Sequence, residues 1–565
     1  MSSHLLKVRQ SLQGVFDSIS PVGNWGWTLL VAAIALPICT PILVVLSSIF
    51  SNSGEIWGHL VETVLPDYLK NSFILMVGVG LGTFIIGTGT AWLSTMCRFP
   101  GGRWLEWLLL LPLATPAYLL AYVYTEFLDF YGFVQTTLRQ IFGWSNAGDY
   151  WFPDIRSMGG AIAMLVLVLY PYVYLLARVA FLEQSTCTIE ASRSLGCNPW
   201  RSFVRIAIPL ARPSIIAGLA LVLMETLSDF GTVEYFGIVT FTTGIYRTWL
   251  GMGERTAAAQ LAAVLLIFVL VLIALERRSR RQARYYQTTN QAKPFQPYQL
   301  QGIRGGAALV ACTIPVILGF VLPVGVLLEM ALYHPASTLG RNFWNLSYHS
   351  LVLAVITAVL GVILALIMAY GQRLQKNFAM SFSVRIAAMG YAIPGSVIAV
   401  GVLIPIGRFD NTLDAWMRAN FDISTGLLLS GTIAALIFAY LVRFLAVSFN
   451  TVESSLGKIQ PSLDDAARSL GHSPTSTLIK VHAPLMSGGL LTAAMLVFVD
   501  VMKELPATLV IRPFNFDTLA IRVYQYASDE RLVEAAAPAL AIVLVGIIPV
   551  IFLSLKIARS RYRSS

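Results

Sequence analysis

Charged residues are scarce in this sequence. They make up only 12% of its 565 residues, whereas hydrophobic residues make up 56%. A soluble globular protein carries about 25% charged residues. The composition therefore excludes an ordinary soluble domain and indicates a protein that lies within a lipid bilayer.

Cysteine and histidine are also few, and neither is clustered. The five cysteines (Cys39, Cys97, Cys187, Cys197 and Cys312) show no C-x-x-C spacing, so we expect free thiols and no disulfide. The six histidines are scattered along the chain (His4, His59, His334, His349, His472 and His482). A lone histidine is more often a loop or interface residue than a metal ligand, and no metal site is assigned firmly.

The motifs of several enzyme classes are absent. No G-x-x-x-x-G-K-[ST] string occurs, and Gly457-Lys458 lacks the upstream glycine of a P-loop. The sequence also has no H-E-x-x-H and no G-x-S-x-G motif. We therefore expect a chain that is not an enzyme and that binds no cofactor of its own.

Long apolar runs are what the sequence has in abundance. Several approach the ~20 residues that a helix needs to cross a bilayer, and only helices and closed barrels satisfy the backbone in lipid. The sequence predicts an all-α polytopic membrane protein with about twelve spans. These are residues 27–50, 71–94, 105–126, 159–181, 213–228 and 257–275, followed by 306–333, 349–371, 386–406, 425–447, 486–503 and 535–555. The first run is too long for a signal-peptide core, so we interpret it as a retained helix.

A polar segment, residues 190–218, occurs twice. Residues 465–490 repeat it in register, 275 positions later. The recurring residues are Ala191, Arg193, Ser194, Leu195, Gly196, Pro199 and Pro209, which match Ala466, Arg468, Ser469, Leu470, Gly471, Pro474 and Pro484. Further matches pair Asn71-Ser72 with His349-Ser350, and Ala114-Thr115-Pro116 with Ala392-Ile393-Pro394. The chain is therefore predicted to be a duplicated unit.

The duplication predicts two six-helix repeats, residues 1–275 and 305–565. They are joined by a polar, basic linker, residues 276–304, for which a cytoplasmic position is expected. An even number of spans per repeat gives both repeats the same orientation, so the repeat is parallel.

Basic residues gather in alternate loops. They include Arg193, Arg201 and Arg205 in the first polar segment, and a cluster of five arginines at 277–284. Because cytoplasmic loops carry an excess of Lys and Arg, both polar segments and both chain termini are predicted to be cytoplasmic. The net charge of +10 is then a consequence of this bias, and no nucleic-acid partner is expected.

Both polar segments resemble the EAA loop of binding-protein-dependent ABC importer permeases. The first copy reads Glu190-Ala191-Ser192, then Gly196, then Ile208-Pro209-Leu210. The second reads Asp465-Ala466-Ala467, then Gly471, then Ala483-Pro484-Leu485. Ser192 and Asp465 depart from the family pattern, but both changes keep size or charge type.

The resemblance implies where an ATPase would dock. In this family, a short cytoplasmic helix fits a cleft on a separate ATP-hydrolysing subunit. The implied coupling residues are Glu190, Ala191, Gly196, Pro209, Asp465, Ala466, Gly471 and Pro484. Two copies of the ATPase, with ATP and magnesium bound to them, and a periplasmic substrate-binding protein are the expected partners. An ordinary amphipathic cytoplasmic loop is the alternative interpretation.

Residues 224–262 resemble the corresponding region of ferric-iron permeases, in which two permease units are fused in one chain. This implies an inner-membrane permease for Fe³⁺, whether bare or chelated. Fused permeases for thiamine or phosphonates share the plan and remain the first alternative. An ion-driven secondary transporter is the second alternative, but it gives no reason for two EAA segments. A channel, which needs no ATPase, is a third.

Four carboxylates occupy equivalent positions of the two repeats. Glu225 corresponds to Asp500 and Asp229 to Glu504, and each repeat spaces its pair i, i+4, which predicts one helix face. Ionisable residues within spans are expensive and usually line a cavity, and oxygen ligands suit a hard cation. We therefore predict a substrate pathway at Glu225, Asp229, Asp500 and Glu504, with Glu234 and Tyr235 just outside. The alternative is that these acids only solvate the membrane interface, or pair with Lys503, Arg247 and Arg522.

Overall fold

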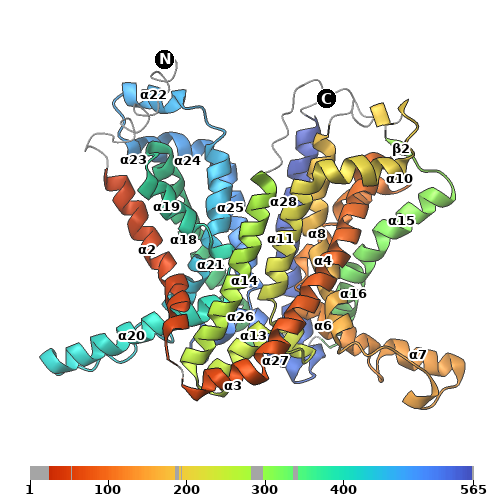
Figure 1. Ribbon diagram of the computed structural model, residues 1–565, viewed down its shortest axis with the longest axis horizontal. Helices are drawn as coiled ribbons and strands as arrows, with labels where there is room; N and C mark the ends of the chain where they lie inside the picture. The colour runs from red at the N-terminus through yellow and green to blue at the C-terminus, as the bar shows by residue number, and fades with distance from the viewer. Residues whose placement is uncertain are drawn as a thin grey trace, which may run out of the picture. The chain divides into compact units, whose positions relative to one another are not determined.

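The computed structural model describes residues 25–52, 54–184, 190–192, 194–281, 297–334 and 341–562. These residues are almost all helical (Figure 1). Within them, the one strand pairing is a parallel contact of two residues each, between β1 (Cys97–Arg98) and β2 (Tyr298–Gln299). The predicted all-α class is therefore confirmed, whereas Cys187 and most of the linker lie outside the described residues.

The chain divides into two compact units, each of which draws on both sequence repeats. The first unit contains residues 1–44, 352–391 and 401–501, and the second contains residues 45–351, 392–400 and 502–565. Each unit is described separately below.

The second unit is built around four long helices. They are α4 (Leu65–Met96), α8 (Met158–Glu183), α11 (Ile208–Ser228) and α14 (Arg255–Arg281). Glycines let α4 approach α8 closely, because a Cβ on Gly87 would lie 2.7 Å from Val173 Cβ and one on Gly82 would lie 2.5 Å from Val166 Cγ2. Small residues at such contacts are typical of helices that pack within a membrane.

The remaining elements complete the second unit, among them the 31-residue helix α28 (Leu532–Tyr562). They are η1 (Ser48–Phe50), α3 (Glu55–Thr63), α5 (Gly102–Leu108), η2 (Leu111–Ala114), α6 (Ala117–Leu128), α7 (Phe133–Phe142), η3 (Ala147–Asp149), α10 (Pro199–Ser202), η4 (Phe203–Ala207), α12 (Gly231–Tyr235), α13 (Phe241–Tyr246), η5 (Arg247–Gly251), α15 (Ile303–Val316), η6 (Ile317–Val321), α16 (Leu322–Tyr333), the start of α18 (Arg341–Leu374), α26 (Pro506–Ile511), α27 (Leu519–Ser528) and α28 (Leu532–Tyr562). A buried ion pair fastens α8 to α5, since Arg178 Nη2 lies 2.9 Å from Glu106 Oε2.

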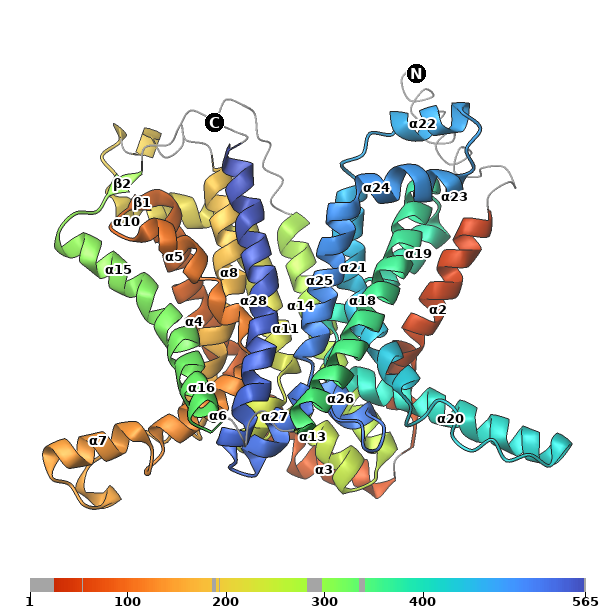
Figure 2. The same cartoon turned by 180° about the vertical axis from the view of Figure 1, so that it is seen from behind.

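The first span of the second repeat packs against helices of the first repeat. Within the second unit, Tyr124 donates a hydrogen bond of 2.7 Å from its hydroxyl to Leu318 O, and Thr115 donates one of 3.4 Å to Gly319 O. Figure 2 shows α15 and α16 beside α4 and α6.

In the first unit, conversely, the first span of the first repeat packs against helices of the second repeat. The unit is formed by most of α2 (Trp25–Ser47), the end of α18, α19 (Phe378–Ala387), most of α20 (Gly395–Phe421), α21 (Ile433–Leu456), α22 (Ser462–Ser469), α23 (Pro474–Thr477), η8 (Leu478–His482), α24 (Ala483–Leu485) and α25 (Ser487–Met502), with η7 (Gly390–Ala392) at its edge. Here α2, from the first repeat, packs on the second: a Cβ on Gly371 would lie 2.9 Å from Val31 Cγ2, and one on Gly401 would lie 2.6 Å from Pro41 O.

The structure has ten helices apolar and long enough to span a membrane among the described residues, or up to twelve if two bent pairs each count as one span. One bent pair corrects the predicted straight span 105–126: α5 with η2 meets α6 and α7 at 92°. The bend falls at Thr115, which is extended (φ −98°, ψ 121°) because it precedes Pro116. Ile393-Pro394 likewise lies between η7 and α20, within the predicted span 386–406.

The other bent pair lies at the end of the second polar segment. The helical run 474–485 meets α25 at 80°, with Met486 at the bend, whereas the equivalent run of the first copy continues without such a break into α11. The observed helix α25, with 16 residues, is therefore shorter than its counterpart α11 in the first repeat, which has 21.

Candidate functional site

The second polar segment folds as two short helices separated by a glycine. α22 ends at Ser469, and Gly471 follows with φ +80°. Ser473 then caps α23 by accepting a hydrogen bond from the backbone N–H of Ser476, and one π-helical turn, η8, leads to Pro484 at the start of α24. The glycine is required here because a left-handed φ is costly for any residue with a Cβ.

The first polar segment repeats this fold in detail. Residues 190–192 and 194 are helical, Gly196 has φ +77°, and Asn198 caps α10. Cys197 N donates to Ser192 O at 3.0 Å, and the equivalent bond, from His472 N to Ala467 O, has the same length. The π-helical turn η4 recurs at the equivalent residues, and Pro209 lies in the first turn of α11. Residues 185–189 and Arg193 lie outside the described part of the chain.

Both segments expose the predicted coupling residues. Glu190, Ala191, Asp465 and Ala466 are all exposed, and Asp465 pairs with its neighbour Arg468 on the surface, at 2.9 Å. A leucine beside each glycine is exposed as well: Leu195 is 84% exposed and Leu470 is 80% exposed. The sequence showed these leucines as repeated residues, but their exposure, which suits a docking contact, comes from the structure. We name the two segments that carry these exposed residues, 190–202 and 465–477, the coupling segments.

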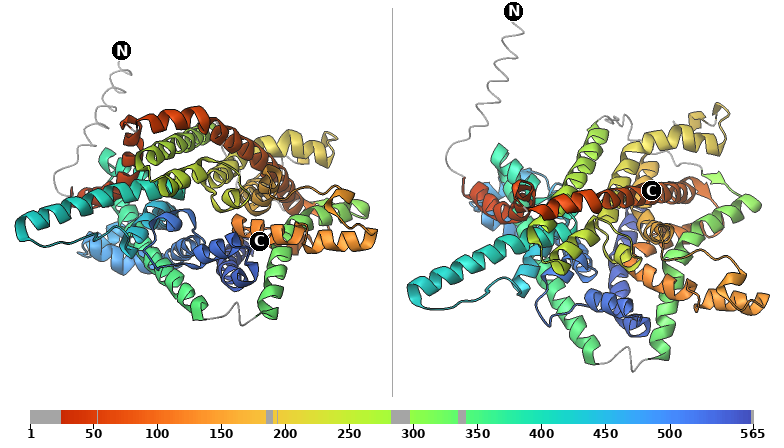
Figure 3. Two further views of the ribbon diagram at one scale, coloured as in Figure 1. Left: turned by 90° about the horizontal axis from the view of Figure 1, so that it is seen from below. Right: turned by 60° about the horizontal axis from the view of Figure 1, so that its bottom comes forward.

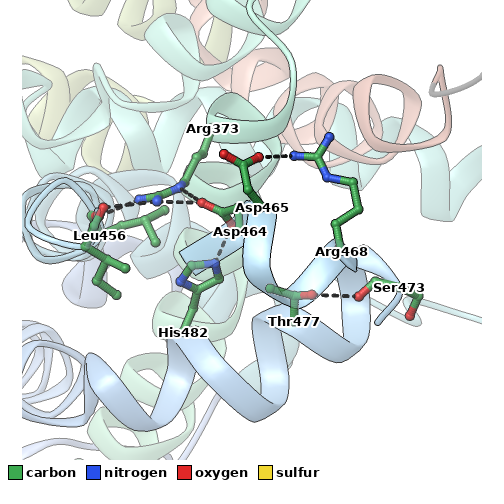
Figure 4. Close-up of polar contacts among 9 residues, drawn as sticks. Arg373, Leu456, Asp464, Asp465, Arg468, Ser473, Thr477 and His482 are labelled. Atoms are coloured by element: carbon green, nitrogen blue, oxygen red, sulfur yellow. Dashed lines mark hydrogen bonds and ion pairs between the residues drawn. The ribbon is translucent and has the colours of Figure 1, made fainter. Parts of the chain in front are cut away.

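A cluster of charged side chains anchors the second coupling segment to its own unit (Figure 4). Asp464 Oδ2 accepts hydrogen bonds from Arg373 Nε at 2.9 Å and Nη2 at 2.6 Å, and Asp464 Oδ1 lies 2.6 Å from His482 Nε2. Arg373 also donates to the carbonyl oxygens of Leu456 and Ile459, at 2.8 and 3.0 Å. One carboxylate therefore joins α22 to the end of α18 and to η8.

The environment of this cluster keeps Asp464 ionised. Partial burial raises its pKa, but the hydrogen bonds from His482 and Arg373 outweigh burial and hold the pKa of Asp464 below its ordinary value. His482 is fully buried and its ring packs 5.3 Å from that of Tyr370.

Neutral groups anchor the first coupling segment. The hydroxyls of Ser192 and Ser202 share a buried hydrogen bond of 2.9 Å, and Gln184 Nε2 donates to Ala207 O at 2.9 Å. In the repeat alignment, Ala207 occupies the position of His482, and Ile189 that of Asp464. The charged anchor was missed from the sequence. The signal that could have found it is this departure between two otherwise matching copies.

Two of the predicted pathway acids begin short helices. Asp229 follows the end of α11 and accepts hydrogen bonds from the backbone N–H of Val233 (3.1 Å) and the hydroxyl of Thr232 (3.0 Å). Glu504 follows the end of α25 and accepts the backbone N–H groups of Ala507 (2.9 Å) and Thr508 (3.0 Å). The expectation that each i, i+4 pair lies on one helix face is therefore wrong, because the helix ends between the two acids. Carboxylates at these positions satisfy orphan N–H groups of the next helix.

The other pathway residues are placed as follows. Glu225 lies on α11 and Asp500 on α25; Glu234 pairs with Arg247 at 3.4 Å, and Tyr235 packs its ring 4.5 Å from Tyr122. Among the described residues, no group of three or more His, Cys, Asp or Glu could hold a metal ion. The pathway role of these residues stays a prediction.

Comparison with known proteins shows the family. The profile described as "Binding-protein-dependent transport system inner membrane component" matches the chain twice, over residues 83–284 and 361–562. The chain is 26% identical over 542 residues to the Fe(3+)-transport system permease protein FbpB 2 of Haemophilus influenzae, covering 93% of this chain and 97% of that protein. It is 23% identical over 475 residues to the ferric transport system permease protein FbpB of Actinobacillus pleuropneumoniae, covering 80% of this chain and 64% of that protein.

A shorter relative fits the duplication. The molybdenum transport system permease protein ModB of Escherichia coli (strain K12) is 28% identical over 232 residues, which cover 96% of that protein but 39% of this chain. The double match, the two coupling segments and the apolar helices lead to one conclusion: the chain belongs to the family of binding-protein-dependent transport system inner-membrane components, as a multi-pass ABC permease subunit with two fused copies of the family's domain.

Proposed function

We propose that this permease imports ferric iron, driven by two copies of a separate ATPase that dock on the coupling segments. The observation that carries the proposal is the matched fold of the two segments. Each presents an exposed acid, a small residue and a leucine beside a left-handed glycine. Two alike surfaces in one chain suit two copies of one partner.

The substrate proposal rests on the relatives. Ferric permeases match most of the chain, whereas the molybdenum permease matches the length of one family domain. A periplasmic binding protein would deliver the iron, and binding of ATP by the partner subunits would drive the change of access. The chain itself would catalyse no covalent step and bind no cofactor, with ATP and magnesium held by the ATPase.

Uptake into proteoliposomes tests this proposal. The purified permease is reconstituted with its ATPase and binding protein, and the initial uptake of labelled Fe³⁺ is measured with molybdate, thiamine or a phosphonate as competitor. We expect uptake that requires both partners and is unaffected by the competitors. Competition by one of them would assign that substrate instead, and Fe³⁺ uptake without the ATPase would contradict an ABC mechanism.

The orientation is proposed from the distribution of basic residues. With both coupling segments in the cytoplasm, a Ser194→Cys variant should resist a membrane-impermeant thiol reagent added outside spheroplasts. A Ser145→Cys variant, whose position is also exposed in the structure, should react. The reverse pattern would overturn the orientation and the docking assignment together.

The carboxylates Glu225, Asp229, Asp500 and Glu504 are proposed to attract the cation. Their equivalent positions in the two repeats support this role, whereas the bonds of Asp229 and Glu504 to helix N–H groups also give them a structural role. The test is Fe³⁺ uptake per permease molecule in the Asp229→Asn, Glu504→Gln double variant. Reduced uptake at a normal protein level supports the pathway, and a reduced protein level with normal uptake per molecule supports capping alone.

A further inference from the structure

Beyond the bend in the third predicted span, helix α7 and the chain that returns from it project from the second unit. We call this segment an arm. α6 is buried along most of its length, but α7, only a few residues further on, has no buried residue. Figure 3 shows this segment, in orange, extending away from the bundle of its own unit. It lies at the end of the unit opposite to α10 of the first coupling segment (Figure 1).

The polar side of α7 is already occupied by the chain around it. Gln135 Nε2 donates to Leu128 O at 2.7 Å, and its Oε1 accepts the hydroxyl of Tyr150. Arg139 donates to Phe130 O at 2.7 Å and stacks its guanidinium 3.9 Å from the ring of Phe130. The charge and the hydrogen-bonding groups of this face are therefore satisfied within the arm.

The apolar side of α7 stays largely exposed, although Phe133 stacks on Phe127 at 5.7 Å and Phe142 on Trp144 at 4.7 Å. Ile141 and Phe142 are 69% and 60% exposed, and with Val134 and Leu138 they form one face of the helix, while Phe133, 68% exposed, lies beside that face. A helix in water would place its polar face outward and its apolar face against the chain. This arm does the reverse.

The first unit carries an arm of the same design but different chemistry. In the C-terminal half of α20, Asp410 accepts the backbone N–H groups of Leu429 and Ser430, and Asp414 accepts that of Gly426 at 2.9 Å. Arg418 pairs with Asp414 at 2.7 Å. The return loop thus satisfies the polar side of this helix, as the return loop does for α7.

The remaining face of the α20 arm is again apolar. Phe409 and Trp416 are each 53% exposed, and Leu413 lies between them on the same side of the helix. Its return loop adds three exposed leucines, Leu427, Leu428 and Leu429.

We infer that both arms lie in the lipid interface, with these apolar faces in the bilayer. The polar faces of the two arms differ, one with an arginine and the other with two aspartates and an arginine, so no one protein surface would complement both. What they share is an exposed stripe of aromatic and aliphatic side chains, which is the surface that suits the boundary of headgroups and acyl chains. Two aspartates and an arginine within nine residues would also be expensive for α20 inside the hydrocarbon core, so its second half fits the interface.

Spin-label accessibility in proteoliposomes tests this inference without the binding protein or the ATPase, so it is independent of the proposed function. In a variant with all five cysteines replaced, nitroxides are attached at Ile141→Cys and Trp416→Cys on the apolar faces. Gln140→Cys and Asn411→Cys, both exposed off the apolar stripe, are the matched controls. We expect a higher ratio of oxygen collisions to nickel-chelate collisions at residues 141 and 416 than at residues 140 and 411.

Equal ratios at all four positions, or greater nickel access at 141 and 416, would overturn the lipid assignment. Nickel access that disappears on addition of the binding protein would show a protein docking face instead. If the cysteine-free variant does not fold, photo-crosslinking amino acids at residues 141 and 416 of the otherwise native chain give the same decision. Adducts with lipid are expected, and their absence would contradict the inference.

Discussion

The two coupling segments present almost the same surface but are anchored by different means. Both place a helix, a left-handed glycine, a capped second helix and a π-helical turn in the same order. The second is joined to its unit by the Arg373–Asp464–His482 cluster, and the first by a pair of serine hydroxyls and a glutamine.

This difference indicates that the exposed surface of each segment and the contacts that hold the segment to its unit are formed by separate sets of residues. Under the proposed function, one partner docks on both segments, which explains why residues of the surface are repeated between the copies. The residues beneath are under no such constraint and have only to hold each segment against its own helices. A charged, partly buried anchor loses more when one member is removed than a neutral one does, because the remaining charges are left without partners. The second segment should therefore be the more sensitive to single substitutions in its anchor.

The largest effect is expected at the feature that the two segments share. Gly196→Val and Gly471→Val place a β-branched residue at φ near +80°. Either the backbone keeps this φ, at a cost of about 1–2 kcal/mol of strain, or the turn adopts another conformation. Among the described residues other than the two chain neighbours, no atom lies within 4 Å of the added Cβ, so folding should survive. We expect roughly a tenfold or greater loss of binding to the ATPase in each case, since about 1.4 kcal/mol is tenfold.

Co-purification of the ATPase with each glycine variant is the measurement, and the amount of permease in the membrane is the control. Full binding and full transport in both single variants and in the double variant would exclude the two turns from docking.

The next largest effect is confined to the second segment. Asp464→Leu leaves Arg373 and His482 without their carboxylate. We expect the stability of that segment to fall by about 2–3 kcal/mol. This loss is smaller than that for a fully buried ion pair, because the side chains of Arg373 and Asp464 are each 17% exposed. The number of ATP molecules hydrolysed per Fe³⁺ transported should rise, because the segment would follow the ATPase without moving the membrane helices of its unit.

A double variant sharpens this prediction. Arg373→Met with Asp464→Leu removes both charges, so it should be less destabilised than Asp464→Leu alone. Thermal unfolding in detergent and the ratio of ATP hydrolysed to Fe³⁺ transported are the two measurements. Additive losses in the double variant would show that Arg373 and Asp464 act independently.

The sequence predicted more of the surface than of the anchors. Periodicity and composition predicted the helical class, and repetition predicted both coupling segments, since a surface that occurs twice leaves matching residues such as Gly196 and Gly471. The bend at Thr115-Pro116 was visible only as a repeated motif, and the apolar runs on either side of it hid the break.

Contacts between distant residues, such as Arg373 with Asp464, leave no local pattern. Asp229 and Glu504 were recognised as equivalent, but their position just beyond a helix end required the structure.

A smaller effect is expected in the first segment. Ser192→Ala installs the residue type that the second copy has at this position, Ala467, and removes the hydroxyl pair with Ser202. The expected loss is about 1 kcal/mol, the usual net contribution of a neutral hydrogen bond. Ser194→Ala is the control, because that hydroxyl is on the exposed side and donates to Glu190 O within its own segment, at 3.1 Å. A loss as large as that of Asp464→Leu would erase the proposed difference between neutral and charged anchors.

The smallest effect concerns pH and the charge of Asp464. Because its pKa in the folded protein lies below the ordinary value of about 3.9, ionised Asp464 adds stability that is complete above that value and is lost as the pH falls through the folded pKa. The groups that face it are Arg373 of α18, His482 of η8 and Tyr370 of α18. The difference in denaturant midpoint between the native chain and Asp464→Asn should therefore stay constant from about pH 5 to 8 and shrink only below about pH 4. A difference that changes between pH 5 and 8 would contradict the assignment of this dependence to Asp464. The described anchor contacts of the first segment, Ser192 with Ser202 and Gln184 with Ala207, join neutral groups, so the matching comparison with Ser192→Ala should show no such pH dependence.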